Sequence, residues 1–324
     1  MKGFLDSDTS DRRTFIQEAA AKRGVTPTII EKDFWVCFVL DKLFSSDYGE
    51  YITFKGGTSL SKVYGLIDRF SEDIDLTLDK EFINSFGNAT SVAPDKISKR
   101  CRKVIKEHLL PDVSAMLQDY GACSLSTEDD QTILFSYESC LEQGVEDYIK
   151  RDVKIELGAR GEREPSVQKT VTPYIAEMLP KVFDGDIPEI EVTALTAERT
   201  FWEKATILHS IACQPEDKKL SPRMCRHYHD VYSIMRHSDT LETALQDKDL
   251  LHQVVQHKRD YFRERWDWYP SAKPGSFRLL PPEHLVKDLK DDYQKTKVMF
   301  FDEPVPYDTL MGELEKLENR LNEI

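Results

Sequence analysis

The sequence predicts an α+β protein in which a mixed sheet flanked by helices is followed by a mainly helical C-terminal domain. Three observations indicate this order. "DIDLTL", residues 73–78, alternates charged and apolar side chains at a period of two, which is typical of a strand. "QTILFSYES" and "RDVKIELGAR" also have strand character, and from Thr196 onward the pattern is helical. We therefore expect two domains, residues 1–190 and residues 191–324.

The elements of the first half follow from local signals. Residues 10–24 predict a helix with Ser10 or Asp11 as N-cap and Gly24 as its stop, and a second helix is expected to start near Thr26 and Pro27. "YITFKGG" predicts a short buried strand that ends in a turn, and "TSLSKVYGLI" predicts the next helix.

Two further helices are expected later in the chain. Residues 95–120 have helical character, and Pro111 is expected to kink or break this helix because proline lacks the backbone N–H. The last segment, residues 308–324, is an amphipathic helix with leucines at helical spacing. These leucines are Leu310, Leu314, Leu317 and Leu321.

The composition argues against a membrane protein and an exported protein, and it limits how a nucleic acid could bind. The 324 residues are 40% hydrophobic and 31% charged, as in ordinary soluble proteins, and no apolar run reaches the roughly 20 residues of a membrane span. Six scattered cysteines without a CxxC pair, and a polar N-terminus, favour a cytoplasmic protein without a membrane partner. The net charge of −14 repels polyanions, so a nucleic-acid partner needs a local basic patch.

An acidic strand follows a glycine turn in this chain. Residues two apart in a strand point the same way, so Asp73 and Asp75 share one face, where a divalent cation would relieve their repulsion. Oxygen ligands favour Mg²⁺ or Mn²⁺, which would hold the phosphates of an NTP. The N–H groups of the preceding turn and helix start could bind phosphate oxygens. The residues of this turn are Gly56, Gly57, Thr58 and Ser59.

Each of these motifs alone is common on exposed strands and turns. Here they occur in the order strand, glycine turn, helix and acidic strand. This order resembles that of the nucleotidyltransferase fold related to DNA polymerase beta. The segments "EKDFWV", "FKGGTSLSKVYGLIDRFSEDIDL", "VKIELGAR", "ERTFWEKATIL" and "RHYHDVYSI" appear in the order found in the AbiEii/AbiGii toxin family, to which MenT-like toxins are related. The resemblance runs through most of the chain.

The resemblance implies a toxin of a bacterial toxin–antitoxin or phage-defence system. Such an enzyme would be a Mg²⁺-dependent nucleotidyltransferase that moves a nucleoside monophosphate from an NTP to RNA. The implied acceptor is the 3′ end of tRNA, so that translation is blocked. The implied partners are a cognate antitoxin protein and the RNA acceptor.

The family's first motif falls on Gly57, Thr58, Asp73 and Asp75. Thr58 stands where some relatives have serine, and it keeps the hydroxyl group. The spacer before the two aspartates is longer than in shorter relatives, and we still expect phosphate contact at the turn.

Two later positions match a lysine and an aspartate of the family. Lys204 in "FWEKATIL" is expected to bind the triphosphate, although its helical position alone favours a lysine at the rim of a core. Asp230 in "RHYHDVYSI" is expected to position Lys204 or the nucleotide. The alternative is a surface acid paired with Arg226 one helical turn earlier.

Sites of the polymerase-beta type usually add a third carboxylate from a neighbouring strand. Glu156 in "VKIEL" is the candidate, and Asp152 on the same face of that strand is its competitor. An exposed sheet edge would explain both residues equally well.

A basic stripe occurs in residues 95–108. Its opposite face, Ile97, Cys101, Val104 and Ile105, is expected to be buried. The stripe is a candidate RNA contact, and the alternative is a solvated helix face. The RNA candidates are Lys99, Arg100, Arg102, Lys103 and Lys106, with Lys96 on the same stripe.

Other chemistries fit the sequence less well. No lysine follows the glycines as in a P-loop, hydrolase signatures are absent, and the spacing of His227 and His229 does not suit a metal site on a helix. Two alternatives to RNA modification remain. One is transfer of AMP or UMP to a protein hydroxyl, and the other is a non-catalytic scaffold that binds nucleotide or antitoxin.

Overall fold

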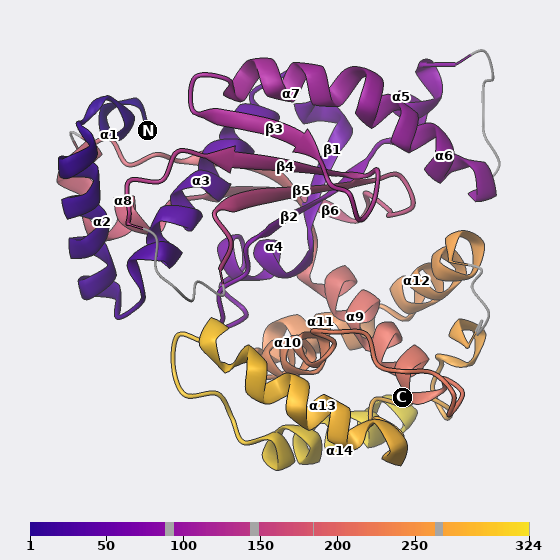
Figure 1. The fold of residues 1–324 in the computed structure, drawn as a ribbon. Coiled ribbons are helices and arrows are strands. Elements are labelled where there is room, and N and C mark those ends of the chain that lie inside the picture. Colours follow the sequence, from indigo (N-terminus) through magenta and orange to yellow (C-terminus); the bar gives the residue numbers. More distant parts are fainter. Residues whose placement is uncertain (88–93, 143–148, 184, 263–267, 324) are drawn as a thin grey trace. The chain divides into compact units, whose positions relative to one another are not determined.

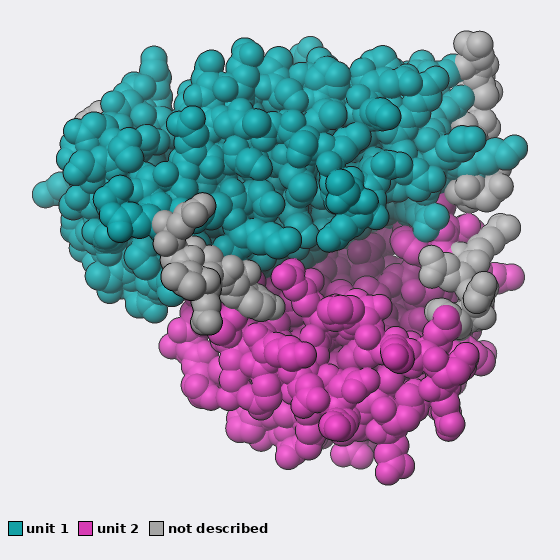
Figure 2. Space-filling model, viewed as in Figure 1, with its two compact units in different colours: residues 1–63, 70–195 teal, residues 64–69, 196–324 magenta. Residues whose placement is uncertain are grey.

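The computed structural model describes residues 1–87, 94–142, 149–183, 185–262 and 268–323 (Figure 1). The chain forms two compact units (Figure 2). The first contains Met1–Val63 and Phe70–Leu195, and the second contains Tyr64–Arg69 and Thr196–Ile324. The short segment Tyr64–Arg69 thus folds with the second unit, although the chain on both sides of it belongs to the first.

A seven-stranded mixed sheet is the centre of the first unit, which confirms the predicted α+β class. The strand order is β3-β4-β5-β2-β1-β7-β6, so the acidic strand β2 occupies the middle. It pairs antiparallel with β1 and parallel with β5. The bounds are β1 Ile52–Lys55, β2 Asp73–Leu78, β3 Gly121–Leu125, β4 Thr132–Tyr137, β5 Asp152–Gly158, β6 Ser166–Val171 and β7 Ile190–Leu195.

The alternation in β2 gives this strand two different faces. Ile74 and Leu76 are buried, whereas Asp73 and Asp75 on the other face are only half-buried. The predicted strand and the shared face of the two aspartates are therefore confirmed.

Helices surround this sheet in the first unit (Figure 1). Helix α2 ends at Gly24 with φ 76°, as expected, but its N-cap is Asp8, which accepts a hydrogen bond from the Asp11 N–H. The α-helices are α1 Lys2–Asp6, α2 Thr9–Arg23, α3 Pro27–Phe44, α4 Gly56–Lys62, α5 Lys80–Ser85, α6 Pro94–Val104, α7 Leu110–Leu117 and α8 Tyr174–Met178.

Pro111 does not interrupt the helical path, so the predicted break is absent here. A π-helical turn, Ile105–Leu109, joins α6 to α7 directly before this proline. The wider turn accommodates a residue that has no N–H and whose ring crowds the preceding turn. Short 3₁₀ turns occur at Gly49–Tyr51 and Pro180–Phe183.

The second unit is helical in its described residues. Its helices are α9 Ala197–Ala212, α10 Cys225–Met235, α11 Ser238–Gln246, α12 Lys248–Tyr261, α13 Glu283–Lys295 and α14 Tyr307–Glu323, with 3₁₀ turns at Tyr269–Ser271 and Thr296–Met299. Helix α14 buries all four of its periodic leucines, which confirms the amphipathic prediction. None of the helices in the described part of the chain has the length and apolar character that a membrane span requires.

Candidate active site

Three carboxylates meet on the neighbouring strands β2 and β5. The parallel register sets Asp75 opposite Glu156 and Asp73 opposite Lys154. Side chains at directly paired positions point to the same side of the sheet, so Glu156 joins the face of the two aspartates. It also forms a side-chain hydrogen bond with Asp75.

The crowding of the three carboxyl groups affects the ionisation of Glu156. Desolvation by the surrounding protein, followed by the negative charges of Asp75 and Asp73, raises the pKa of Glu156 to about 8. Part of the Glu156 surface remains exposed, so the carboxyl group is crowded but reachable from solvent. At neutral pH it therefore carries a proton, which it can donate to Asp75.

Asp152 occupies a different position in β5. The pairs between β5 and β2 begin at Lys154, so Asp152 lies beyond them and opposite Ser136 of β4. One of its carboxylate oxygens is buried without a hydrogen-bond partner among the described residues. The register therefore brings Glu156, and not Asp152, beside Asp75.

Gly56 lies against the same carboxylate cluster, where only glycine fits. Its φ of +79° lies in the left-handed region, and a Cβ at this position would collide with the Asp75 carboxylate. The glycine turn thus lies directly against the acidic strand, as the combined motif predicts. Helix α4 begins at Gly56 itself, so both glycines belong to its first turn.

Thr58 and Ser59 are buried at the start of α4. The Thr58 hydroxyl donates to the carbonyl of Asp73 at 2.5 Å and lies 2.9 Å from the hydroxyl of Ser71. Thr58 therefore fastens α4 to the beginning of β2. The Ser59 hydroxyl has no partner among the described residues.

The donor chemistry of this cluster fits a hard divalent cation. All three side chains offer carboxylate oxygens, which Mg²⁺ and Mn²⁺ prefer, and the missing Cβ of Gly56 lets the Asp75 carboxylate lie directly against the glycine turn. Within the described residues, no three His, Cys, Asp or Glu side chains are arranged as a complete metal site.

A second polar cluster is buried within the helical unit. Lys204 of α9 contacts Asp230 of α10, with 2.7 Å between Nζ and Oδ2. Arg69 donates to the two oxygens of the same carboxylate through Nε and Nη2, each at 2.8 Å. Arg69, Lys204 and Asp230 together carry one excess positive charge. Because all three side chains are buried, this charge is only weakly screened by solvent.

Asp230 stays ionised in this cluster. Burial alone would raise its pKa, but the positive charges of Arg69 and Lys204 hold the pKa of Asp230 well below its usual range. The residue is 0% exposed, so the alternative of a surface acid paired with Arg226 does not describe it. Burial and the neighbouring Lys204 lower the pKa of His227, which is therefore neutral.

Arg69 lies within "RFSEDIDL" but is not among the site residues that the motifs predict. A lone arginine four residues before Asp73 could have indicated an anion or carboxylate partner. Its actual partner, Asp230, lies 161 positions away, and no local pattern reveals such a pairing.

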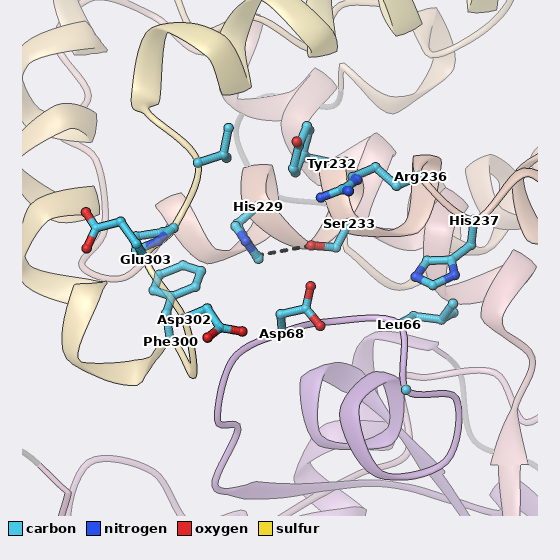
Figure 3. Close-up of a pocket in the computed structure, with 13 residues that line it drawn as sticks. Leu66, Asp68, His229, Tyr232, Ser233, Arg236, His237, Phe300, Asp302 and Glu303 are labelled. Atoms are coloured by element: carbon cyan, nitrogen blue, oxygen red, sulfur yellow. Dashed lines mark hydrogen bonds between the residues drawn. The ribbon is translucent and has the colours of Figure 1, made fainter. Parts of the chain in front are cut away.

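A pocket with a volume of about 390 Å³ borders the same segment in the helical unit (Figure 3). His229 of α10 lines this pocket, and its Nδ1 lies 3.4 Å from the Ser233 hydroxyl oxygen. The rings of His229 and Phe300 pack edge to face. Burial lowers the pKa of His229 to about 4, so this side chain is neutral at physiological pH. Asp68, which precedes Arg69, also lines the pocket.

The basic stripe on α6 has the predicted buried and exposed faces. Ile97, Cys101, Val104 and Ile105 are buried. Arg100 is the exception on the polar side, because it is half-buried and donates to the Asn84 side chain at 3.1 Å. The exposed members are Lys96, Lys99, Arg102, Lys103 and Lys106.

Comparisons with known proteins confirm the resemblance that the motifs indicated. A family model described as "Nucleotidyl transferase AbiEii toxin, Type IV TA system" matches residues 39–313. The structure is similar to that of MenT4, a nucleotidyltransferase toxin from Mycobacterium tuberculosis H37Rv. The identity is 17%, the TM-score is 0.52, and the match covers 96% of this chain and 90% of the MenT4 chain. This likeness shows a shared fold. No curated protein matches the chain.

Proposed function

The chain belongs to the AbiEii family of nucleotidyltransferase toxins of type IV toxin–antitoxin systems, and on this basis we propose that it transfers a nucleoside monophosphate from an NTP to RNA. The proposed acceptor is the 3′ end of tRNA, whose modification would block translation. Family membership also implies an antitoxin partner. The observation that carries the proposal is the register of β2 and β5, which sets Asp75 opposite Glu156.

The proposed reaction is an in-line displacement. The acceptor hydroxyl loses its proton and forms a bond to the α-phosphorus of the NTP, while the bond to the β-phosphate breaks and pyrophosphate leaves. Asp73, Asp75 and Glu156 would hold Mg²⁺ or Mn²⁺, which neutralises phosphate charge and favours ionisation of the hydroxyl. The raised pKa of Glu156 supports this role, because carboxylates crowded in this way gain from a shared cation.

The glycine turn and Lys204 would act on the phosphates. Backbone N–H groups of the turn from Gly56 through Gly57, Thr58 and Ser59 would face the triphosphate. Lys204 would balance the charge of the departing pyrophosphate, and the 2.7 Å contact with Asp230 would fix its ammonium group. The exposed basic face of α6 supports an RNA acceptor, because phosphate contacts need such local charge on an acidic protein.

A labelling experiment tests the reaction and its acceptor together. The protein is incubated with each α-labelled NTP, Mg²⁺, total tRNA and cell lysate, in parallel with Asp73→Asn and the matched control Asp152→Asn. Label in tRNA that requires Asp73 but not Asp152 is the expected result. Label in protein would instead support a protein hydroxyl as acceptor. If no label depends on Asp73, both enzymatic functions are refuted and a scaffold remains.

Toxicity is tested separately in growing cells. Expression of the wild-type chain should arrest growth, and Asp75→Asn or Lys204→Met should relieve the arrest at equal protein levels on an immunoblot. Arrest of the same strength in these variants would contradict a catalytic origin of the toxicity.

A further inference from the structure

Lys32 is a buried cation in helix α3 to which the proposed chemistry gives no role. It is 1% exposed, and its ammonium group donates to the Glu72 carboxylate and to the Lys150 carbonyl, both at 2.8 Å. Burial of two charges is costly, and their attraction offsets this cost only when the geometry and the remaining hydrogen bonds are good. The 2.8 Å contact meets the first condition, and the second hydrogen bond of the Lys32 ammonium group, to the Lys150 carbonyl, contributes to the other.

The two acceptors belong to the strands that carry the carboxylates. Glu72 directly precedes β2, and Lys150 lies two residues before β5. Because β2 and β5 are parallel, both acceptors lie at the same end of the strand pair. Helix α3 packs against both strands, so the Lys32 ammonium group is supplied from a rigid element.

We propose that Lys32 is a positioning residue that fixes the beginning of β2 to the beginning of β5 and so keeps Asp75 opposite Glu156. A shift of one residue between strands moves every side chain to the other face of the sheet, so this register decides whether the carboxylates meet. The functional part of this inference rests on the proposed nucleotidyltransferase site. The structural part, the joining of the two strands, does not depend on it.

A partly exposed ion pair at the opposite end of β2 provides a comparison. Arg163 contacts Asp79, which follows the last residue of β2, with 2.7 Å between Nη1 and Oδ2, and also donates to Thr53 at 3.0 Å. This pair stabilises the fold away from Asp73 and Asp75. Arg163→Met should therefore lower the unfolding temperature without changing cation affinity.

The test variant replaces both charged partners. Lys32→Met alone leaves the buried Glu72 carboxylate without its cation, and the resulting loss of stability would mask any effect on the site. Lys32→Met/Glu72→Met removes one positive and one negative charge, so the net charge is unchanged and two apolar side chains of similar length fill the space. Because the two charges removed are opposite and only 2.8 Å apart, their fields at the site largely cancel, and the exchange measurement reports the position of the strands directly.

Two measurements are made on the full-length protein. Hydrogen–deuterium exchange should become faster in peptides that cover residues 71–75 and 150–156, while the Arg163→Met protein keeps wild-type exchange there. Titration with Mn²⁺, followed by electron paramagnetic resonance, should show affinity weakened by about tenfold or more, as is typical when the partners behind metal ligands are lost.

The outcomes separate this inference from the proposed function. A folded double variant with wild-type exchange in both peptides overturns the inference, whatever its activity. Wild-type Mn²⁺ affinity despite faster exchange also overturns it. If the wild-type protein binds no Mn²⁺, the proposed metal site fails, and the exchange measurement still decides whether Lys32 joins the two strands.

Discussion

Arg69 and Asp230 form a bidentate ion pair between residues 161 positions apart in the chain. Arg69 lies in the short segment that folds with the helical unit, four residues before Asp73. The acidic strand is therefore preceded by a residue that is anchored to the carboxylate that also binds Lys204. One aspartate thus fixes both the segment that leads to β2 and the proposed phosphate-binding lysine.

Asp230→Asn should destabilise the protein strongly. It leaves the buried Arg69 and Lys204 side chains without their negative partner, for which we expect a loss of about 3–5 kcal/mol in the free energy of unfolding. Chemical denaturation measures this loss. The control is Asp308→Asn, which removes an ion pair with Lys290 but whose side chain is 85% exposed. There the loss should stay below about 1 kcal/mol, and an equal loss in both variants would contradict the prediction.

The same pair makes stability depend on acid pH. Because the pKa of Asp230 in the folded protein lies far below 3.8, its ordinary value, the stabilisation is present above about pH 4. It is lost as the pH falls further and the unfolded chain takes up a proton. The free energy of unfolding of Asp230→Asn should therefore depend less on pH below 4 than that of the wild type.

The extent to which the sequence predicted the fold depends on the range of the interactions. Strands β2, β4 and β5 were predicted because they are interior strands with clear alternation. Strands β3 and β6 are the two edges of the sheet, and β6 is largely exposed, so neither has an apolar face to reveal it. Strand β7 does alternate, with Ile190 and Val192 buried, but Pro188 lies just before it and is typical of a loop, which obscures the start of the strand.

In the candidate site, too, the features set by local geometry follow from the sequence, and those set by long-range contacts do not. The shared face of Asp73 and Asp75 follows from strand geometry alone. The choice of Glu156 over Asp152 needed the register between two strands, which neither strand encodes by itself. The partners of Lys32 lie 40 and 118 positions away, so its buried ion pair has no local signal.

Lys204 and Arg69 should contribute differently to stability and activity. Lys204→Met leaves Asp230 with its two hydrogen bonds from Arg69, so we expect a loss of only about 1–2 kcal/mol in stability. Its labelling activity should fall by roughly 10² or more, because a charge aimed at the leaving group is lost. Arg69→Met should show the larger loss of stability. If Lys204→Met unfolds the protein or retains full activity, this division of roles is wrong.

The raised pKa of Glu156 predicts pH-dependent cation binding. Below about pH 8 Glu156 holds a proton that a cation must displace, so the apparent Mn²⁺ affinity should rise with pH and level off only above about pH 8. Titration calorimetry in buffers of different ionisation enthalpy should detect the released proton. Glu156→Gln should lose this proton release, whereas Asp152→Asn should keep it.

The raised pKa of Glu156 affects the stability of the fold in the opposite direction: cation affinity rises with pH, whereas the free energy of unfolding falls. The folded protein retains a proton on Glu156 that the unfolded chain releases near pH 4.5, so the contribution of this group to stability falls as the pH rises from about 4.5 to 8. Glu156→Gln cannot ionise and should therefore unfold at a higher temperature than the wild type at pH 8. An unchanged unfolding temperature at pH 8 would count against the shifted pKa.

Gly56→Ala should disturb the site beyond its effect on the backbone. Alanine at a φ of +79° costs about 1–2 kcal/mol, and its Cβ would also displace the Asp75 carboxylate. Gly275→Ala is the matched control, because Gly275 has a φ of +82° and nothing within 4 Å of an added Cβ. Both variants should lose similar backbone stability, but only Gly56→Ala should lose Mn²⁺ binding and nucleotide transfer. Loss of transfer in both would contradict a specific contact with Asp75.

Charge reversal on the exposed face of α6 tests the RNA contact. Lys99→Glu/Arg102→Glu/Lys103→Glu changes three solvated side chains on one helix face and leaves Arg100, which binds Asn84, in place. We expect weaker tRNA binding at low salt in a filter-binding assay, with cation affinity unchanged. Transfer to tRNA should fall through a higher KM for tRNA, because the variant leaves the carboxylates untouched.

The salt dependence separates a direct RNA contact from a general effect of charge. Each phosphate contact that is lost reduces the slope of log K against log salt concentration, so three contacts should reduce it by roughly 2 to 3. The control reverses three exposed lysines of α13, Lys287, Lys290 and Lys295, which changes the net charge by the same amount. If both triple variants weaken binding equally, the net charge is responsible. Weakening by the α6 variant alone, with the smaller slope, identifies α6 as the surface that binds RNA.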